Sequence, residues 1–178
     1  DIAAATGILA RHGATPGAEH VRAAKRLIQY VYSTRKLGIQ YSKNSKLEGK
    51  NAPVIYGQGR HPADNGKNLL TTFADSDYAD CDSRRSTQGI VIMMNGGPIA
   101  WSSIRGKTIC MSTAEAEVMA AVSAAKESIH LKLLLGELGV KHDKTVIKED
   151  NTASIAQAKG GLRFIRKAKH YDIACLLY

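Results

Sequence analysis

The sequence predicts an α/β fold in which a mixed β-sheet, with elements in the order β-β-β-α-β-α, is flanked by helices and preceded by a small helical segment. Three observations predict it. Short β-rich runs separated by turn sequences fill residues 69–111, a long alanine-rich segment fills residues 112–138, and another β-rich run follows at residues 145–148. We therefore expect a mixed sheet in which the first and the last of these strands are neighbours.

Two helices are expected at the N-terminus. The first covers residues 2–12 and ends before Gly13 and Pro16, which break the helical pattern. The second runs from about Pro16 to Thr34, because its apolar residues recur at the i, i+3, i+4 spacing of one helix face. These residues are Val21, Ala24, Leu27, Ile28 and Val31.

The stretch that follows these helices is expected to be a connection. Gly38 ends the helical pair, residues 39–41 are a candidate strand, and residues 43–68 are rich in Lys, Asn, Gly and Pro, as a linker or long loop would be. Residues 1–68 also hold eleven Lys and Arg against four Asp and Glu, so they carry most of the net charge of +9. Such a basic part fits a polyanionic partner such as nucleic acid, while a solvated basic face without a partner remains the alternative.

Within the sheet region, residues 69–75, 89–94 and 99–103 are expected to be strands. The sequence Asn95-Gly96-Gly97 between the last two is a strong hairpin turn signal. Residues 105–107 resemble another turn, which makes residues 108–111 a further strand of the meander.

A capping box opens the long helix, with Ser112 at the N-cap and Glu115 three residues later. The helix is expected to reach about Leu138, where Gly139 stops it. Beyond the strand at residues 145–148, Asn151 or Thr152 caps a helix to about residue 159, and a final helix begins near residue 167.

The cysteines and the hydropathy limit where such a protein works. Cys81, Cys110 and Cys175 are odd in number and far apart, which argues against a disulfide framework and for a reducing compartment. No apolar run approaches the roughly 20 residues that span a bilayer, and the N-terminus has no signal-peptide pattern. We therefore expect an intracellular protein, in a cytoplasmic particle or the nucleus, with no membrane partner.

Three acidic residues stand at predicted element boundaries: Asp75 ends the first strand, Glu117 lies in the second turn of the long helix, and Asp150 ends the last strand. If the two strands are neighbours, both aspartates meet at one edge, and a helix packed on the sheet can place Glu117 between them. A cluster of carboxylate oxygens is what hard divalent cations prefer. Two such cations about 4 Å apart can activate water and stabilise the leaving oxygen of a phosphodiester.

Glu115 and Glu117 cannot both serve this site, because side chains two residues apart on a helix point about 200° apart. Glu115 is needed for the capping box, so Glu117 is the ligand candidate. A lone helix glutamate is otherwise usually a surface residue.

The acidic run that starts at Asp75 has two rival interpretations, a calcium loop and a nucleotide-sugar site. The EF-hand calcium loop fails, because Ala79 stands at its fifth place and Asp80 at the sixth place, where Gly belongs. The Asp-x-Asp motif of nucleotide-sugar transferases, here Asp75 to Asp77, needs an upstream nucleotide-binding α/β unit, whereas residues 1–68 are helical and linker-like.

Several motifs, in this order and spacing, resemble the C-terminal part of the Ty1/copia-type retrotransposon polyprotein. Asp-Ser-Asp-Tyr-Ala at residues 75–79 is similar to the family's Asp-Ala-Asp-Trp-Ala, with Tyr78 in place of Trp. The other matching stretches are residues 1–3, 19–20, 23–26, 37–41, 84–89, 101–103, 112–117, 150–151 and 169–173. The segment up to residue 41 resembles the tail of the reverse transcriptase module.

The resemblance implies an RNase H-like fold that cuts the RNA strand of an RNA–DNA hybrid, within a reverse transcriptase polyprotein whose other parts are partners. It implies metal ligation by Asp75, Glu117 and Asp150, with two Mg²⁺ ions, or Mn²⁺, as cofactors. It also places Arg84, Arg85, Ser112 and Asn151 along the substrate path, where basic groups contact phosphates and Ser or Asn contacts the minor groove. For Arg84 and Arg85, an exposed turn is the structural alternative, and His170 is either a substrate contact or a helix-end histidine.

The implied organisation is a helical tail of the thumb or connection region at residues 1–42, a linker at 43–68 and an RNase H-like domain at 69–178. This domain is expected to be incomplete at its C-terminus, because the family's fifth strand and its closing helix, which carries a fourth carboxylate, have no counterpart in residues 1–178. The alternative function is therefore a non-catalytic, truncated retroelement remnant that folds and binds nucleic acid. Polymerase activity is not expected of these residues, because the catalytic aspartates of a reverse transcriptase belong upstream of Asp1.

Overall fold

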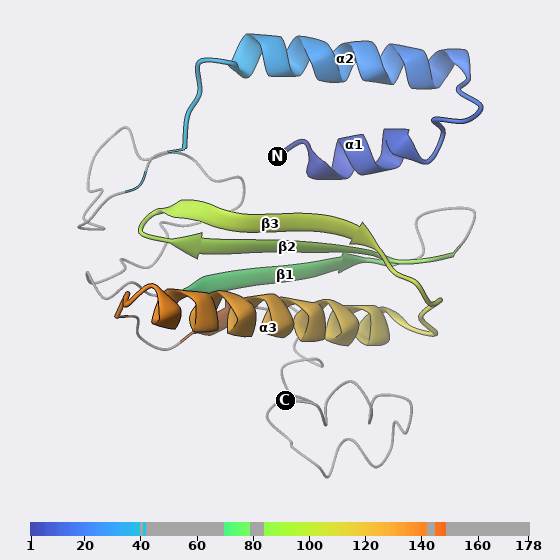
Figure 1. The fold of residues 1–178 in the computed structure, drawn as a ribbon. Helices are drawn as coiled ribbons and strands as arrows, with labels where there is room; N and C mark the ends of the chain where they lie inside the picture. The colour runs from blue at the N-terminus through green and yellow to red at the C-terminus, as the bar shows by residue number, and fades with distance from the viewer. Residues whose placement is uncertain (40, 42–69, 79–83, 142–144, 149–178) are drawn as a thin grey trace.

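The computed structural model describes residues 1–39, 41, 70–78, 84–141 and 145–148 of the 178-residue chain. Over these residues the chain forms an α/β fold with a four-stranded mixed sheet and three helices. Figure 1 shows the sheet as the middle layer, with α3 (Thr113–Glu137) on one side and α1 (Ala3–Ala10) and α2 (Ala18–Thr34) on the other. The predicted α/β class and mixed sheet are confirmed.

The first three strands form an antiparallel meander. They are β1 (Thr71–Asp77), β2 (Thr87–Met94) and β3 (Gly97–Arg105), with β2 in the middle. The β2–β3 connection is a two-residue turn in which Asn95 and Gly96 both have positive φ, 53° and 82°. Two positive φ values are what a type I′ hairpin requires, and Asn-Gly is the pair that adopts them most easily. The predicted hairpin is confirmed.

The fourth strand, β4 (Val146–Lys148), lies beside β1 and runs parallel to it, so that the strand order is β3-β2-β1-β4. Thr71 is the register partner of Val146, and Phe73 that of Lys148. Between β3 and β4, the helix α3 carries the chain back to the other end of the sheet. β4 can therefore run in the same direction as its neighbour β1. β1 is therefore an internal strand, and its carboxyl end lies at the same end of the sheet as the carboxyl end of β4.

The core lies between α3 and one face of the sheet. Small residues on α3 let the helix approach the strands closely, and apolar residues of the strands fill the space opposite. The buried members are Leu70, Ala74, Ile90, Ile92, Ala120, Ala124 and Leu135. One polar pair is buried among them: the hydroxyl oxygens of Thr72 and Ser128 lie 2.7 Å apart.

Both ends of α3 are fixed by local chemistry. At the start, the Ser112 hydroxyl accepts a hydrogen bond from the Glu115 N–H, at 3.1 Å, and the Glu115 carboxylate accepts one from the Met111 N–H, at 2.6 Å. At the end, Gly139 has φ +70°, and the Val140 N–H bonds back to the Leu135 carbonyl. This left-handed glycine and the back-bond form a Schellman motif, as the sequence predicts.

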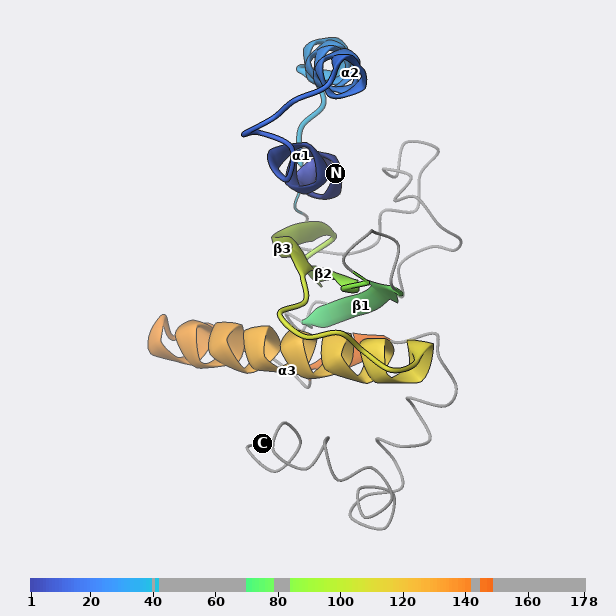
Figure 2. The same ribbon diagram turned by 90° about the vertical axis from the view of Figure 1, so that its right-hand side faces the viewer.

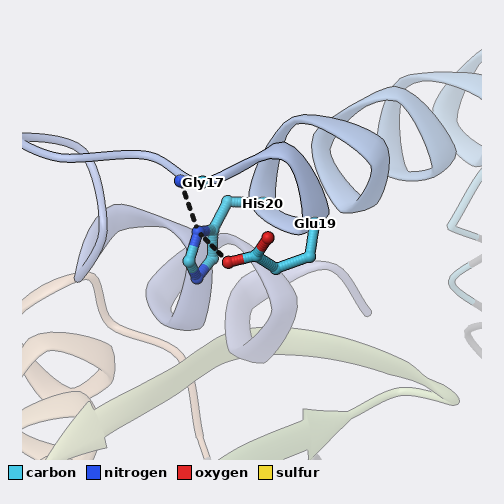
Figure 3. Close-up of polar contacts among 3 residues, drawn as sticks. All are labelled: Gly17, Glu19 and His20. Carbon is cyan, nitrogen blue, oxygen red and sulfur yellow. Dashed lines mark hydrogen bonds and ion pairs between the residues drawn. The ribbon is translucent and has the colours of Figure 1, made fainter.

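The N-terminal helices lie outside this core. Neither α1 nor α2 contains a buried residue, and Figure 2 shows them stacked outward from β3, with α1 the nearer. At the start of α2, the Gly17 N–H donates to His20 Nδ1 at 2.9 Å (Figure 3). The Glu19 carboxylate also lies 3.3 Å from this nitrogen. A single nitrogen cannot accept from Gly17 and donate to Glu19 at once, so the shorter contact, with the Gly17 N–H, is the hydrogen bond that caps the start of α2.

Some boundaries differ from those expected. β1 continues to Asp77, so Asp75 lies within the strand and not at its end. The prediction of a strand at residues 108–111 is wrong: β3 already reaches Arg105, and the Met111 N–H is bound by the capping carboxylate of Glu115, so it cannot join a ladder. Ile39 and Tyr41 do not belong to a strand either.

Other expectations lie outside the described residues: the linker at 43–68, the helices expected after Asp150, and residues Cys81, Cys175 and His170. The proposed boundaries between tail, linker and nuclease domain stay predictions. Among the described helices, none combines the length and the apolar character that crossing a membrane would need.

Candidate functional site

An open pocket of about 210 Å³ lies between α1 and the sheet. The strands contribute Asp75 and Asp77 of β1, Thr87 and Gly89 of β2, and Ser103 of β3. The helical side contributes Ala4, Ile8 and Arg11. The pocket therefore brings together two carboxylates, two hydroxyls and one guanidinium from four separate elements or their flanks.

Strand register explains why these side chains share a face. Asp75 is the partner of Gly89, which is the partner of Ser103, and Asp77 is the partner of Thr87. Side chains of paired residues point to the same face of a sheet, and those of successive residues point to opposite faces. Thr72 and Gln88 contact α3 through Ser128 and Ser123, so the alternating positions Asp75 and Thr87 face away from α3.

Asp75 is exposed and oriented. Its Oδ1 accepts a hydrogen bond from the Ser76 N–H at 2.8 Å, which fixes the rotation of the carboxylate. The opposite residue, Gly89, has no side chain, and even an added Cβ there would find its nearest neighbour, the Asp75 carbonyl oxygen, only at 3.9 Å. The space beside Asp75 is therefore open to a ligand.

The side chain of Glu117 is buried, as a residue that faces the sheet would be. It is 8% exposed and lies on the face of α3 that also buries Ala116 and Ala120. Glu115 instead makes the capping contacts described above, which confirms its predicted capping role. The metal-binding role of Glu117 stays a prediction.

The structure does not bring Asp75 and Glu117 onto one face. Asp75 faces the α1 side of the sheet, whereas Glu117 belongs to the sheet-facing side of α3. Both lie toward the same end of the sheet, since Figure 1 shows the N-terminal end of α3 beside the arrowhead of β1. Within the described ranges, no group of three or more His, Cys, Asp or Glu residues is placed to hold a metal ion.

The remaining predicted site residues are dispersed or undescribed. Arg84 and Arg85 are exposed just before β2, and Arg84 has φ +53°. The hydroxyl of Ser112 is occupied in capping α3. Asp150 and Asn151 lie outside the described residues. The metal-binding and substrate-binding roles of these residues stay predictions.

Sequence reasoning missed Arg11, Thr87 and Ser103. The Arg11 Nη2 donates to the Thr87 Oγ1 at 3.2 Å, a contact between residues 76 positions apart. The only sequence signal for Arg11 was its place as the one charged residue at the end of an apolar helix, AAATGILA. For Thr87 and Ser103 the signal was the strand alternation, which sets them on the same face as Asp75 once the register is known.

Comparison with known proteins identifies the relatives of this chain. It is 32% identical over 174 residues to the retrovirus-related Pol polyprotein from transposon TNT 1-94 of Nicotiana tabacum, a match covering 97% of this chain and 11% of that polyprotein. It is 31% identical over 132 residues to the secreted RxLR effector protein 161 of Plasmopara viticola, covering 74% of this chain and 78% of the effector. The transposon Ty1-LR3 Gag-Pol polyprotein of Saccharomyces cerevisiae is 25% identical over 151 residues, covering 85% of this chain and 8% of that polyprotein.

The chain spans about a tenth of the tobacco polyprotein. No protein-family model and no solved structure matches it. Identities of 25–32% over most of the chain nevertheless show that it belongs to the family of Ty1/copia-type retrotransposon Pol polyproteins.

Proposed function

We propose that this retroelement-derived chain carries the RNase H activity of a reverse transcriptase, which hydrolyses the RNA strand of an RNA–DNA hybrid. The observation that carries the proposal is Asp75, an exposed carboxylate on an internal strand that borders an open pocket. The topology supports an RNase H-like fold, because an antiparallel meander is followed by a long helix and by a strand parallel to β1.

Glu117 and Asp150 are proposed as partners of Asp75. α3 carries Glu117 near the end of the sheet to which β1 points. Asp150 follows Lys148 by two residues, and Lys148 is the parallel register partner of Phe73, which precedes Asp75 by two residues. Asp150 itself lies outside the described residues, and this equal offset in sequence is the reason for proposing it as a partner of Asp75.

The donor chemistry suits a hard divalent cation, Mg²⁺ or Mn²⁺. Carboxylate oxygens are its preferred ligands, and Asp75 presents one at an accessible position. The Glu117 carboxylate, which is 8% exposed, would add oxygen donors of the same kind. When bound, such a cation lowers the pKa of its water and polarises the phosphodiester.

The residues of the chain itself would orient the substrate. The Ser76 N–H holds the Asp75 carboxylate in one rotation, so that its exposed edge faces the pocket. Gly89 leaves room beside that edge for a nucleic acid backbone. Pre-oriented groups of this kind favour reaction, because no rotational freedom has to be lost when the substrate binds.

A second candidate is a non-catalytic retroelement remnant that binds nucleic acid. The observation that favours it is the separation of Asp75 and Glu117 on different sides of the sheet layer. The basic excess in residues 1–68 would serve such binding equally well.

Cleavage of an end-labelled RNA–DNA hybrid in Mg²⁺ distinguishes the candidates. The nuclease proposal expects cleavage by the wild type and its loss in Asp75→Asn and Asp150→Asn. Glu127→Gln, at an exposed position of α3 outside the pocket, is the matched control and should cleave like the wild type. Binding without cleavage, identical in all four proteins, would leave the remnant as the function.

A further inference from the structure

Arg11 has an unusual position for a residue of the segment that resembles a reverse transcriptase tail. It is the C-cap residue of α1, and its guanidinium reaches the sheet face that carries Asp75 and Asp77. Among the described residues, the acceptor that it contacts is the neutral hydroxyl of Thr87, at 3.2 Å and in an exposed setting. A guanidinium has five N–H donors, so one such bond leaves most of its donor capacity for a ligand.

The composition of the pocket indicates which ligand this is. Carboxylates alone would repel a polyanion. A cation bound to them would neutralise their charge but would add no directional hydrogen-bond donors. A guanidinium and two hydroxyls, from Thr87 and Ser103, add donors beside the same carboxylates. Guanidinium groups bind phosphate oxygens in a bidentate manner, so a phosphodiester is a ligand that this set of donors can hold.

We propose that Arg11 binds a backbone phosphate of the nucleic acid strand that lies along Asp75 and Asp77, so that α1 forms part of the substrate site on the sheet. The inference rests on the proposed function, because it assigns the pocket to the same substrate. It adds a positioning residue from a segment of the chain that the nuclease motifs do not include.

Affinity for a fluorescein-labelled RNA–DNA hybrid, measured in Ca²⁺ at several salt concentrations, tests this inference independently of turnover. Arg11→Ala should weaken binding roughly 10-fold, as expected for loss of a hydrogen bond to a charged group. It should also reduce the slope of log affinity against log salt by about 1, because one phosphate contact is lost. Arg11→Lys should keep the slope and recover part of the affinity, since the charge remains but the planar fork does not.

Two further variants separate phosphate binding from a structural tether. Thr87→Val removes the acceptor of Arg11 but not its charge, so the slope should stay at the wild-type value. Lys132→Ala, at an exposed position in the C-terminal half of α3 outside the pocket, also removes one positive charge; it is the matched control and should change the affinity less than 2-fold. If Arg11→Ala and Thr87→Val lower affinity equally, with no change in slope, Arg11 is only a tether and the inference is wrong.

The inference and the proposed function fail in different ways. A wild type that binds hybrid but does not cleave it, with an Arg11-dependent slope, refutes the nuclease and keeps the phosphate contact. A wild type that cleaves, with binding indifferent to Arg11, does the reverse. Absence of hybrid binding by the wild type refutes both.

Discussion

The buried hydroxyl pair between β1 and α3 gives a sharp prediction about what holds the helix on the sheet. Thr72 is 0% and Ser128 2% exposed, and their oxygens lie 2.7 Å apart. The Ser128 hydroxyl has one proton, which it donates to the Ala124 carbonyl at 2.7 Å. Thr72 must therefore be the donor and Ser128 the acceptor, so the two residues are not equivalent.

The magnitudes follow from which group is left without a partner. Thr72→Val keeps the shape and removes the donor, so it should cost about 1 kcal/mol, the net value of one hydrogen bond. Ser128→Ala leaves the Thr72 O–H buried without an acceptor, and this costs about 1–3 kcal/mol. The better helix propensity of Ala returns about 0.5 kcal/mol, so we expect a net loss of about 1.5 kcal/mol.

The double variant provides the test. With both hydroxyls removed, no buried donor is stranded, so the total loss should be smaller than the sum of the single losses by about 1 kcal/mol. Free energies of unfolding from urea titrations, followed by circular dichroism, measure all three. Ser33→Ala on α2, which removes an exposed hydroxyl bonded to the Tyr30 carbonyl, is the matched control and should change stability by less than about 0.5 kcal/mol.

Two results would refute the reasoning. If the single losses add in the double variant, the hydroxyls do not stabilise one another. If Thr72→Val costs more than Ser128→Ala, the direction of the hydrogen bond is the opposite of that deduced.

Three further predictions use matched positions in the same structure. Gly139→Ala should destabilise the protein by about 1 kcal/mol, because the φ of +70° at this position strains an L-residue. Gly136→Ala, inside α3 with nothing within 4 Å of an added Cβ, should instead stabilise it by up to about 1 kcal/mol, and equal effects of the two changes in thermal unfolding would contradict this. Ile92→Ala, at a fully buried site, should cost about 2–5 kcal/mol in urea unfolding, and the 59% exposed Ile104 should tolerate the same change; similar losses would show that α3 does not cover Ile92. Burial raises the pKa of the Cys110 thiol, so the reactive thiolate is disfavoured. In a Cys81→Ser, Cys175→Ser background, iodoacetamide should therefore react with Cys110 slowly at neutral pH and faster at higher pH or in urea, and rapid labelling of the folded protein at neutral pH would be the contrary result.

Local chemistry accounts for what could be predicted from the sequence. The capping box of Ser112 and Glu115, the Asn95-Gly96 turn and the stop at Gly139 each depend on residues at most a few positions apart. Their conformations are therefore determined by neighbours in the chain, and the structure has them where the sequence indicates. The same local logic separated Glu115 from Glu117 before any packing was known.

The sequence by itself thus determined the α/β class, the hairpin, the helix ends and, through its motifs, the retrotransposon family. Only the tertiary structure decided which face of the sheet Asp75 occupies, because a strand's outward side is set by register with β2 and by the helix that covers the other face. Only packing buried Glu117, and only packing brought Arg11 to Thr87 across 76 positions of chain. Such long-range contacts depend on the sum of many burial terms, which no short stretch of sequence contains.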